Sequence, residues 1–307
     1  MKKTVCMVLA MLVGFCFSAD LFANEKDHQK KNYENEKFVW TDNYVSEGNH
    51  AALAPSTEEI VTTCLSKDGK PLRWVRKNDI YKYGKFTGTS TLETALYNMA
   101  VDEMINNFEK DGTLRTGLYW GGVWTRDVSY SSLLSLAYMC PDKVKNSLEV
   151  KIDRMGRIIQ DTGTGGSWPC SSDRVVWALS AWNIYLATGD IEWLQKAYPV
   201  IIKSLECDDM VVFNPQTGLY RGESSFIDWR EQSYPTWAQP ADIYLSECLG
   251  TNAAYYGVLK VTADMAAALG FKKDVKKYTQ KAEALKKAIN DKFWVEEEGY
   301  YASYWYG

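Results

Sequence analysis

Apolar residues recur at helical spacing from Thr91 onward, and this pattern runs through most of the remaining chain. The first such stripe precedes Asp111-Gly112 and comprises Leu92, Ala95, Leu96, Met99, Met104, Ile105 and Phe108. The same spacing predicts further helices at 128–139, 143–160, 173–188, 191–208, 250–269 and 273–290. Residues 38–89 instead mix short β-like segments, such as Arg73–Arg76 and Ile80–Phe86, with Gly and Pro. We therefore predict an all-α protein with a short irregular or β N-terminal extension.

Two stretches of the chain repeat each other with an offset of 81 residues. Gly189 and Gly270 each follow a predicted helix, where a glycine can end the helix in the left-handed conformation. The repeat continues in a turn-forming loop, because Phe213…Gly218-Leu219-Tyr220 is echoed by Phe293…Gly299-Tyr300-Tyr301. The sequence therefore predicts two helical hairpins in register, each followed by a small turn.

Repeated helical hairpins bury their faces against their neighbours and form either solenoids or closed rings. Long loops at 111–127, 161–172 and 209–248 lie between the predicted helices and are rich in Trp, Gly and charged residues. Such loops favour one functional rim on a helical barrel, whereas a solenoid normally has shorter and more uniform repeats. We therefore favour a closed ring of helical hairpins, an α/α toroid, over a solenoid.

The amino terminus has the composition of an export signal. Lys2 and Lys3 precede an apolar run that ends in small residues, so cleavage is expected after Ala19 or Ala23. The run is shorter than the roughly 20 residues that a membrane-spanning helix needs. We therefore expect a signal peptide at 1–23, a flexible polar leader at 24–37, an extension at 38–89, and a periplasmic or secreted protein without a membrane span.

Composition limits the chemistry that the chain can perform. The net charge of −4, with both signs interspersed, gives no basic surface for nucleic acid. Only two histidines are present, so histidine-dependent triads and zinc sites are disfavoured. The five cysteines after the predicted signal contain no C-x-x-C pair, which favours buried thiols over a metal site. We expect no metal and no cofactor, with proton transfer left to Asp and Glu.

One candidate site segment joins tryptophans to a pair of opposite charges. Trp120 and Trp124 can form an apolar wall, while Arg126 and Asp127 offer hydrogen-bond donors and acceptors to sugar hydroxyls. Asp127 also precedes a predicted helix, so helix capping is an equally weighted alternative role.

A second candidate loop, 162–169, is rich in glycine and presents Trp168. It lacks both a G-K-[ST] motif and a strand-turn-helix context, which argues against nucleotide binding. The sequence favours a rim loop that contributes Trp168 to a binding site.

The third candidate loop places three carboxylates among aromatic residues. Glu223, Asp228 and Glu231 lie in this loop and are candidates for a general acid. Aromatic neighbours disfavour a charged carboxylate and raise its pKa, which is how a general acid arises near neutral pH. The loop also supplies candidate sugar-binding residues, which are Trp229, Arg230 and Trp237. A surface loop held by salt bridges is the alternative.

These residues resemble the six-hairpin glycosidases, which include glucoamylases, trehalases, processing α-glucosidases, glycogen-debranching glucosidases and α-rhamnosidases. Trp124-Thr125-Arg126-Asp127 resembles the W-T-R-D element of glucoamylases, whose Arg and Asp hold the nonreducing sugar. Glu223–Trp229 resembles the E-S-G-x-D stretch of trehalases, although this chain has one extra residue and Ser in place of Gly. The resemblance covers about residues 90–307 and implies an incomplete (α/α)6 toroid there, with Asp228 as the general acid. Because the motif departs from the family pattern, Glu231 and then Glu223 remain contenders for that role.

The resemblance implies an inverting exo-glycosidase that acts on α-linked oligosaccharides or polysaccharides, most like an α-glucosidase. Its second carboxylate, the base that activates water, would come from a later hairpin beyond Gly307. Three alternatives remain: a sugar phosphorylase, a glycan-binding or catalytically incomplete toroid protein, and a lyase or epimerase. The shortage of histidine disfavours the last of these.

Overall fold

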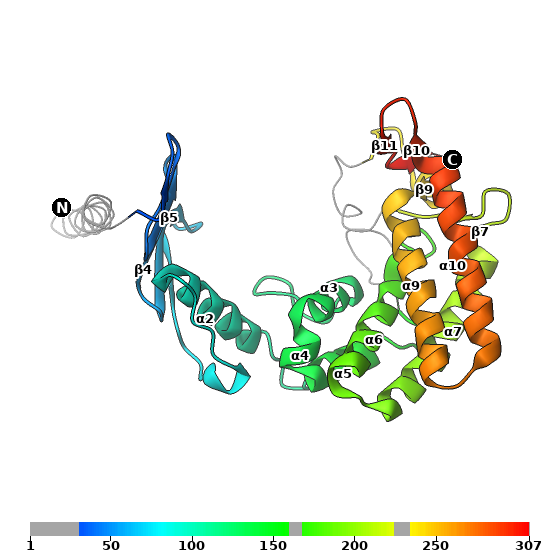
Figure 1. Ribbon diagram of the computed structural model, residues 1–307, viewed down its shortest axis with the longest axis horizontal. Coiled ribbons are helices and arrows are strands. Elements are labelled where there is room, and N and C mark those ends of the chain that lie inside the picture. Colours follow the sequence, from blue (N-terminus) through cyan, green and yellow to red (C-terminus); the bar gives the residue numbers. More distant parts are fainter. Residues whose placement is uncertain (1–30, 160–167, 224–233, 307) are drawn as a thin grey trace, which may run out of the picture. The chain divides into compact units, whose positions relative to one another are not determined.

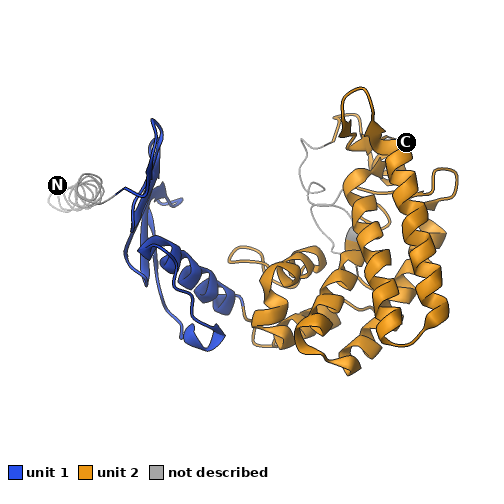
Figure 2. Ribbon diagram, viewed as in Figure 1, with its two compact units in different colours: residues 1–107 blue, residues 108–307 orange. Residues whose placement is uncertain are grey.

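The computed structural model describes residues 31–159, 168–223 and 234–306, which belong to two compact units (Figures 1 and 2). The first unit ends at Asn107 and the second begins at Phe108. The predicted signal peptide, 1–23, lies outside the described residues. Within the described ranges, no helix has the length and apolar character needed to cross a bilayer.

The first unit contains a six-stranded antiparallel sheet whose strands follow one another in sequence order. The strands are β1 (Tyr33–Glu34), β2 (Phe38–Trp40), β3 (Tyr44–Glu47), β4 (His50–Ser56), β5 (Glu59–Leu65) and β6 (Pro71–Val75). Strand β1 lies within 24–37, the segment predicted as a flexible leader. Its backbone is ordered by pairing with β2. The β-like prediction at Ile80–Phe86 is wrong, since this stretch contains a 3-10 turn at Tyr81–Tyr83.

Helix α2 (Thr91–Asn106) packs on this sheet (Figure 1). Ser90 begins the helix with a capping box, in which its hydroxyl accepts from the Glu93 amide and the Glu93 carboxylate accepts from the Ser90 amide. Leu92 and Ala95 are buried against Ala54 and Ile60 of the strands. Part of the apolar stripe that we assigned to the start of the toroid thus faces the sheet, while Leu96 is exposed. The first compact unit ends after α2, at Asn107.

The second unit is mainly helical. Its helices are α3 (Thr125–Ser131), α4 (Ala137–Met139), α5 (Pro141–Glu149), α6 (Trp177–Thr188), α7 (Ile191–Val211), α8 (Pro240–Leu245), α9 (Leu249–Ala268) and α10 (Lys272–Phe293). A π-helical turn, Ser132–Leu136, joins α3 to α4, and a 3-10 turn, Asp173–Val176, leads into α6. Helix α8 was not predicted. Helix α5 ends well before residue 160 because Ile152 and Ile158 pair across a turn instead.

The helices differ in how they meet their neighbours. Helix α6 contacts α3, α5, α7 and α9, and it is rich in apolar residues, as expected of a helix surrounded by others. Helix α10 packs along α9 and buries only one stripe, which includes Tyr278, Ala282 and Leu285. This arrangement fits the hairpins predicted for a six-hairpin domain. A closed toroid remains a prediction.

Four glycine turns recur along the second unit, at Gly112, Gly156, Gly218 and Gly299. Each glycine has a positive φ between 69° and 88°, a region that other residues rarely occupy. The residues flanking these turns pair as Phe108 with Leu114, Ile152 with Ile158, Phe213 with Tyr220, and Trp294 with Tyr301. The last two pairs are offset by 81 residues on both sides, so the predicted repeat is confirmed with Trp294, rather than Phe293, matching Phe213.

The exits of three of these turns are each hydrogen-bonded to a later helix. The amide of Leu114 donates to Ser147 Oγ on α5 at 2.8 Å, and that of Ile158 donates to Ser204 Oγ on α7 at 2.9 Å. The amide of Tyr220 donates to Asn252 Oδ1 on α9 at 2.7 Å. The loops that carry the candidate site residues therefore begin from anchored points.

Candidate active site

Among the three candidate carboxylates, the structure describes only Glu223. Asp228 and Glu231, together with Trp229 and Arg230, lie outside the described residues. Glu223 is 1% exposed. It follows the strand pair β7 (Phe213–Asn214) and β8 (Leu219–Tyr220), which the glycine turn at Gly218 connects. The anchored exit of this turn therefore positions the backbone that leads to Glu223.

The backbone of Glu223 is held from both sides. Its amide donates to the Cys170 carbonyl at 2.7 Å, and its carbonyl accepts from Thr251 Oγ1 of α9 at 2.5 Å. Gly222 permits this approach, because its φ is 125° and a Cβ there would lie 2.5 Å from Ser172 Oγ. Burial raises the pKa of the Cys170 thiol, and the negative charge of Glu223 adds to this effect.

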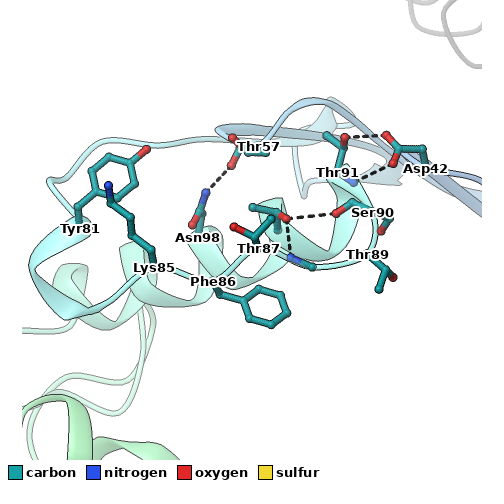
Figure 3. Close-up of a pocket in the computed structure, with 12 residues that line it drawn as sticks. Asp42, Thr57, Tyr81, Lys85, Phe86, Thr87, Thr89, Ser90, Thr91 and Asn98 are labelled. Atoms are coloured by element: carbon teal, nitrogen blue, oxygen red, sulfur yellow. Dashed lines mark hydrogen bonds between the residues drawn. The ribbon is translucent and has the colours of Figure 1, made fainter.

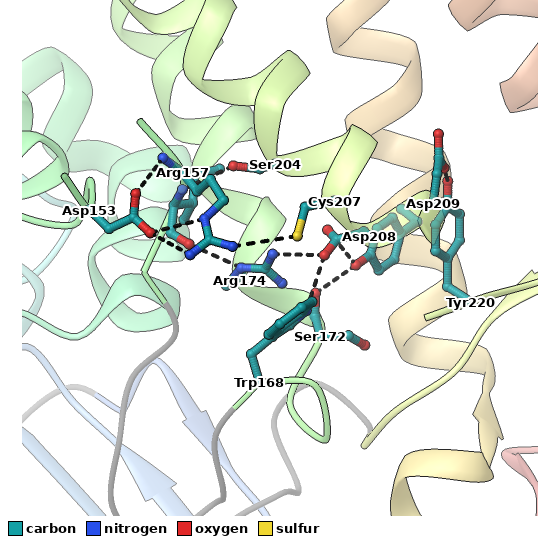
Figure 4. Close-up of polar contacts among 12 residues, drawn as sticks. Asp153, Arg157, Trp168, Ser172, Arg174, Ser204, Cys207, Asp208, Asp209 and Tyr220 are labelled. Carbon is teal, nitrogen blue, oxygen red and sulfur yellow. Dashed lines mark hydrogen bonds and ion pairs between the residues drawn. The ribbon is translucent and has the colours of Figure 1, made fainter. Parts of the chain in front are cut away.

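A buried ion pair lies beside this segment (Figure 4). Arg174 Nη2 donates to Asp208 Oδ1 at 2.7 Å, and the two side chains are 3% and 0% exposed. Asp208 also accepts from Trp168 Nε1 at 3.2 Å and from the Tyr255 hydroxyl at 2.9 Å. Burial raises the pKa of the Asp208 carboxyl, while the Arg174 guanidinium acts in the opposite direction.

The W-T-R-D segment lies at the start of α3. The rings of Trp120 and Trp124 meet edge to face with centroids 5.9 Å apart, and their role as an apolar wall stays a prediction. Helix α3 begins after Trp124, which occupies the N-cap position. Asp127 is therefore the third helical residue, and the alternative that it caps the helix is wrong. Arg126 is half-buried and Asp127 is exposed.

The W-T-R-D segment and the buried ion pair meet at two neighbouring carbonyls. Thr125 Oγ1 donates to the Ile159 carbonyl at 3.0 Å, and Arg174 Nε donates to the Ile158 carbonyl at 3.0 Å. The structure therefore brings together the segments that carry Trp124, Trp168 and Glu223. Trp237 stands apart from these contacts; it is 55% exposed, and its ring meets Tyr306 edge to face.

Sequence reasoning did not identify Asp208, Tyr255 or the role of Arg174. One signal was available for Asp208, which lies between Leu205 and Val212 on the apolar side of a predicted helix, where a carboxylate requires a partner. The partners could not be found in this way, because Arg174 and Tyr255 are distant in sequence.

A separate pocket of about 450 Å³ lies in the first unit, between the sheet and the start of α2 (Figure 3). Hydroxyl groups dominate its lining, which also includes Asp42, Asn98 and the ring of Phe86. None of the predicted site residues lines it. In the described ranges of both units, no three His, Cys, Asp or Glu side chains group closely enough to hold a metal ion.

Comparison with known proteins agrees with the predicted superfamily. Residues 160–304 match the model of the bacterial α-L-rhamnosidase six-hairpin glycosidase domain. This match supports a six-hairpin glycosidase domain for residues 160–304. The matched range includes Glu223, Arg174 and Asp208 and excludes the W-T-R-D segment.

Among solved structures, a rhamnosidase from Klebsiella oxytoca with rhamnose bound matches at 16% identity and a TM-score of 0.44. The match covers 59% of this chain and 35% of that structure, so the chain spans about a third of that protein's length. No curated protein gives a significant match.

Proposed function

We propose that this chain carries catalytic-domain residues of an inverting glycoside hydrolase that cleaves α-linked sugars. The family match over residues 160–304 is the observation that supports this most, because the matched range contains Glu223, Asp228 and Glu231. That family is named for α-L-rhamnosidases. We therefore place α-L-rhamnosides first among the substrates to test, ahead of the α-glucosides favoured by the sequence resemblance.

Hydrolysis with inversion needs a carboxylic acid that protonates the leaving oxygen and a carboxylate that activates water. We propose Asp228 as the acid, and a carboxylate of a later hairpin as the base. Glu223 would hold the sugar from a fixed position, since its backbone is clamped by Cys170 and Thr251. The tryptophan pair at Trp120 and Trp124 would supply an apolar wall.

The experiment is a hydrolysis assay of the whole protein with aryl α-L-rhamnosides and aryl α-D-glucosides. We expect Asp228→Asn to lower kcat by about 10²- to 10⁴-fold, the usual contribution of a general acid or base. Glu283→Gln is the matched control, because Glu283 is exposed on α10, and it should leave kcat unchanged. Proton NMR of the first-formed anomer tests inversion.

Other outcomes would replace the proposal. Turnover that requires phosphate would identify a sugar phosphorylase. Calorimetric binding of sugars without turnover, in a protein with an unchanged unfolding midpoint, would identify a glycan-binding protein. Unaltered hydrolysis by Asp228→Asn would reject the assigned acid.

A further inference from the structure

We infer that Asp208 positions Trp168 so that one face of its ring forms a wall of the sugar site beside Glu223. This inference rests on the proposed function. It assigns Asp208 a positioning role, exerted through the indole of Trp168, and assigns Trp168 direct contact with the sugar.

Three donors from three segments converge on the Asp208 carboxylate of α7 (Figure 4). Oδ1 accepts from Arg174 Nη2 at 2.7 Å and from Trp168 Nε1 at 3.2 Å, while Oδ2 accepts from the Tyr255 hydroxyl at 2.9 Å. Because the carboxylate is fully buried, water does not compete for these bonds. The orientation of the indole is thereby tied to two long helices, α7 and α9.

One face of the Trp168 ring is in contact with Arg174. The Arg174 guanidinium carbon lies 5.1 Å from the ring centroid, at the distance of a cation–π contact. Arg174 is buried, whereas Trp168 is only partly buried. Arg174 therefore covers one face of the ring, and we assign to the opposite face the stacking contact with the apolar C–H side of a sugar.

A backbone hydrogen bond also connects the segment that carries Trp168 to Glu223. The Cys170 carbonyl, two residues after Trp168, accepts the hydrogen bond of the Glu223 amide. Because the indole N–H is engaged by Asp208, the ring can offer the sugar only its apolar face. Trp168 would thus supply contact area, and Glu223 would supply polar contacts.

The inference is tested by NMR of the whole protein with ¹⁵N-labelled tryptophan. The Trp168 indole signal is assigned by its loss in Trp168→Phe, which keeps an aromatic ring but lacks the N–H. Trp182→Phe assigns the control, a partly buried tryptophan on α6 with no hydrogen bond from its indole to a described residue. We expect the Trp168 indole proton to exchange with D₂O at least tenfold more slowly than that of Trp182.

Added substrate or product sugar should shift the Trp168 signal and leave that of Trp182 unchanged. Trp168→Ala should raise KM about tenfold or more with a smaller change in kcat, since a stacking contact is present before and during the reaction. Asp208→Asn should speed exchange of the Trp168 indole. If that variant does not fold, the exchange comparison in the unaltered protein and the Trp168 variants still decide the question.

The inference fails if the Trp168 indole exchanges as fast as that of Trp182. It fails equally if sugar leaves the Trp168 signal unmoved, or if Trp168→Ala retains the original KM. Failure of the proposed function has a different signature, because no sugar would then be hydrolysed, whatever residue stands at position 168.

Discussion

We expect replacement of Asp102 on α2 to lower the stability of the first unit. Its carboxylate is fully buried and ties the segment after β6 to the helix. Oδ1 accepts from the amide and the side chain of Asn78, both at 2.8 Å, and Oδ2 accepts from Trp74 Nε1 at 3.0 Å. Asp102→Asn replaces one oxygen with a donor, so one or two of these bonds are lost in either orientation of the amide.

Each hydrogen bond to a charged group contributes about 1.5–3 kcal/mol. Loss of one or two from this site should therefore lower the free energy of unfolding by about 2–4 kcal/mol. Hydrogen exchange of amides in β4–β6 and α2 should accelerate by about 30-fold to several hundred-fold, because 1.4 kcal/mol corresponds to a factor of ten. Glu103→Gln, an exposed change at the next position of the same helix, is the control and should have no effect.

The effect of Asp102→Asn should also depend on pH. Burial by itself would raise the pKa of the Asp102 carboxyl, but the hydrogen bonds from Trp74, Asn78 and Lys77 outweigh it and lower the pKa. The stability that this group contributes is present above its unfolded pKa of about 3.9 and is lost as pH falls through its lower folded pKa. The exchange difference between the variant and the original protein should thus shrink in acid. An equal difference at pH 7 and well below pH 4 would refute the reasoning.

Two further predictions concern a glycine and the cysteines. Gly222→Ala should lower the free energy of unfolding by about 3 kcal/mol in urea titrations, because the added Cβ would meet Ser172 Oγ at a strained φ. Gly270→Ala is the control and should cost about 1 kcal/mol, because Gly270 also has a positive φ but has open space around it. Equal losses in the two variants would contradict the steric argument. Iodoacetamide should label the exposed Cys64 at least 100-fold faster than Cys140 at pH 8 in the folded protein, because burial raises the pKa of the Cys140 thiol from 9.0 to about 11. Mass spectrometry of the peptides measures both rates, and equal labelling would contradict the burial of Cys140.

The features that could be predicted from the sequence are those set by local conformation. Gly189 and Gly270 follow their helices with positive φ, as the repeat indicated, because few other residues adopt that conformation. The turns at Gly218 and Gly299 have the same strand pairing, so the offset of 81 residues is a real structural repeat. These features depend on only a few consecutive residues.

The features that could not be predicted depend on tertiary contacts. The apolar stripe of α2 is typical of a helix that packs on another helix, yet it packs on a sheet, and nothing in its spacing distinguishes the two partners. Asp127 precedes a predicted helix in the sequence, but α3 begins earlier, after Trp124, and so the aspartate is not the cap. The convergence of Arg174, Asp208 and Tyr255 requires three helices to be placed in space.

The buried ion pair is better explained by positioning than by stability. Removing a carboxylate and a guanidinium from water costs about as much as their attraction returns, so an apolar pair of similar size would stabilise the fold equally well. Arg174 adds to this cost, because its Nη1 is buried and has no hydrogen-bond partner among the residues that the structure describes. Sequences that retain such a costly arrangement commonly do so at functional sites. Here it lies beside the clamped backbone of Glu223 and fixes the indole of Trp168, which is the arrangement that a rigid sugar-binding wall requires.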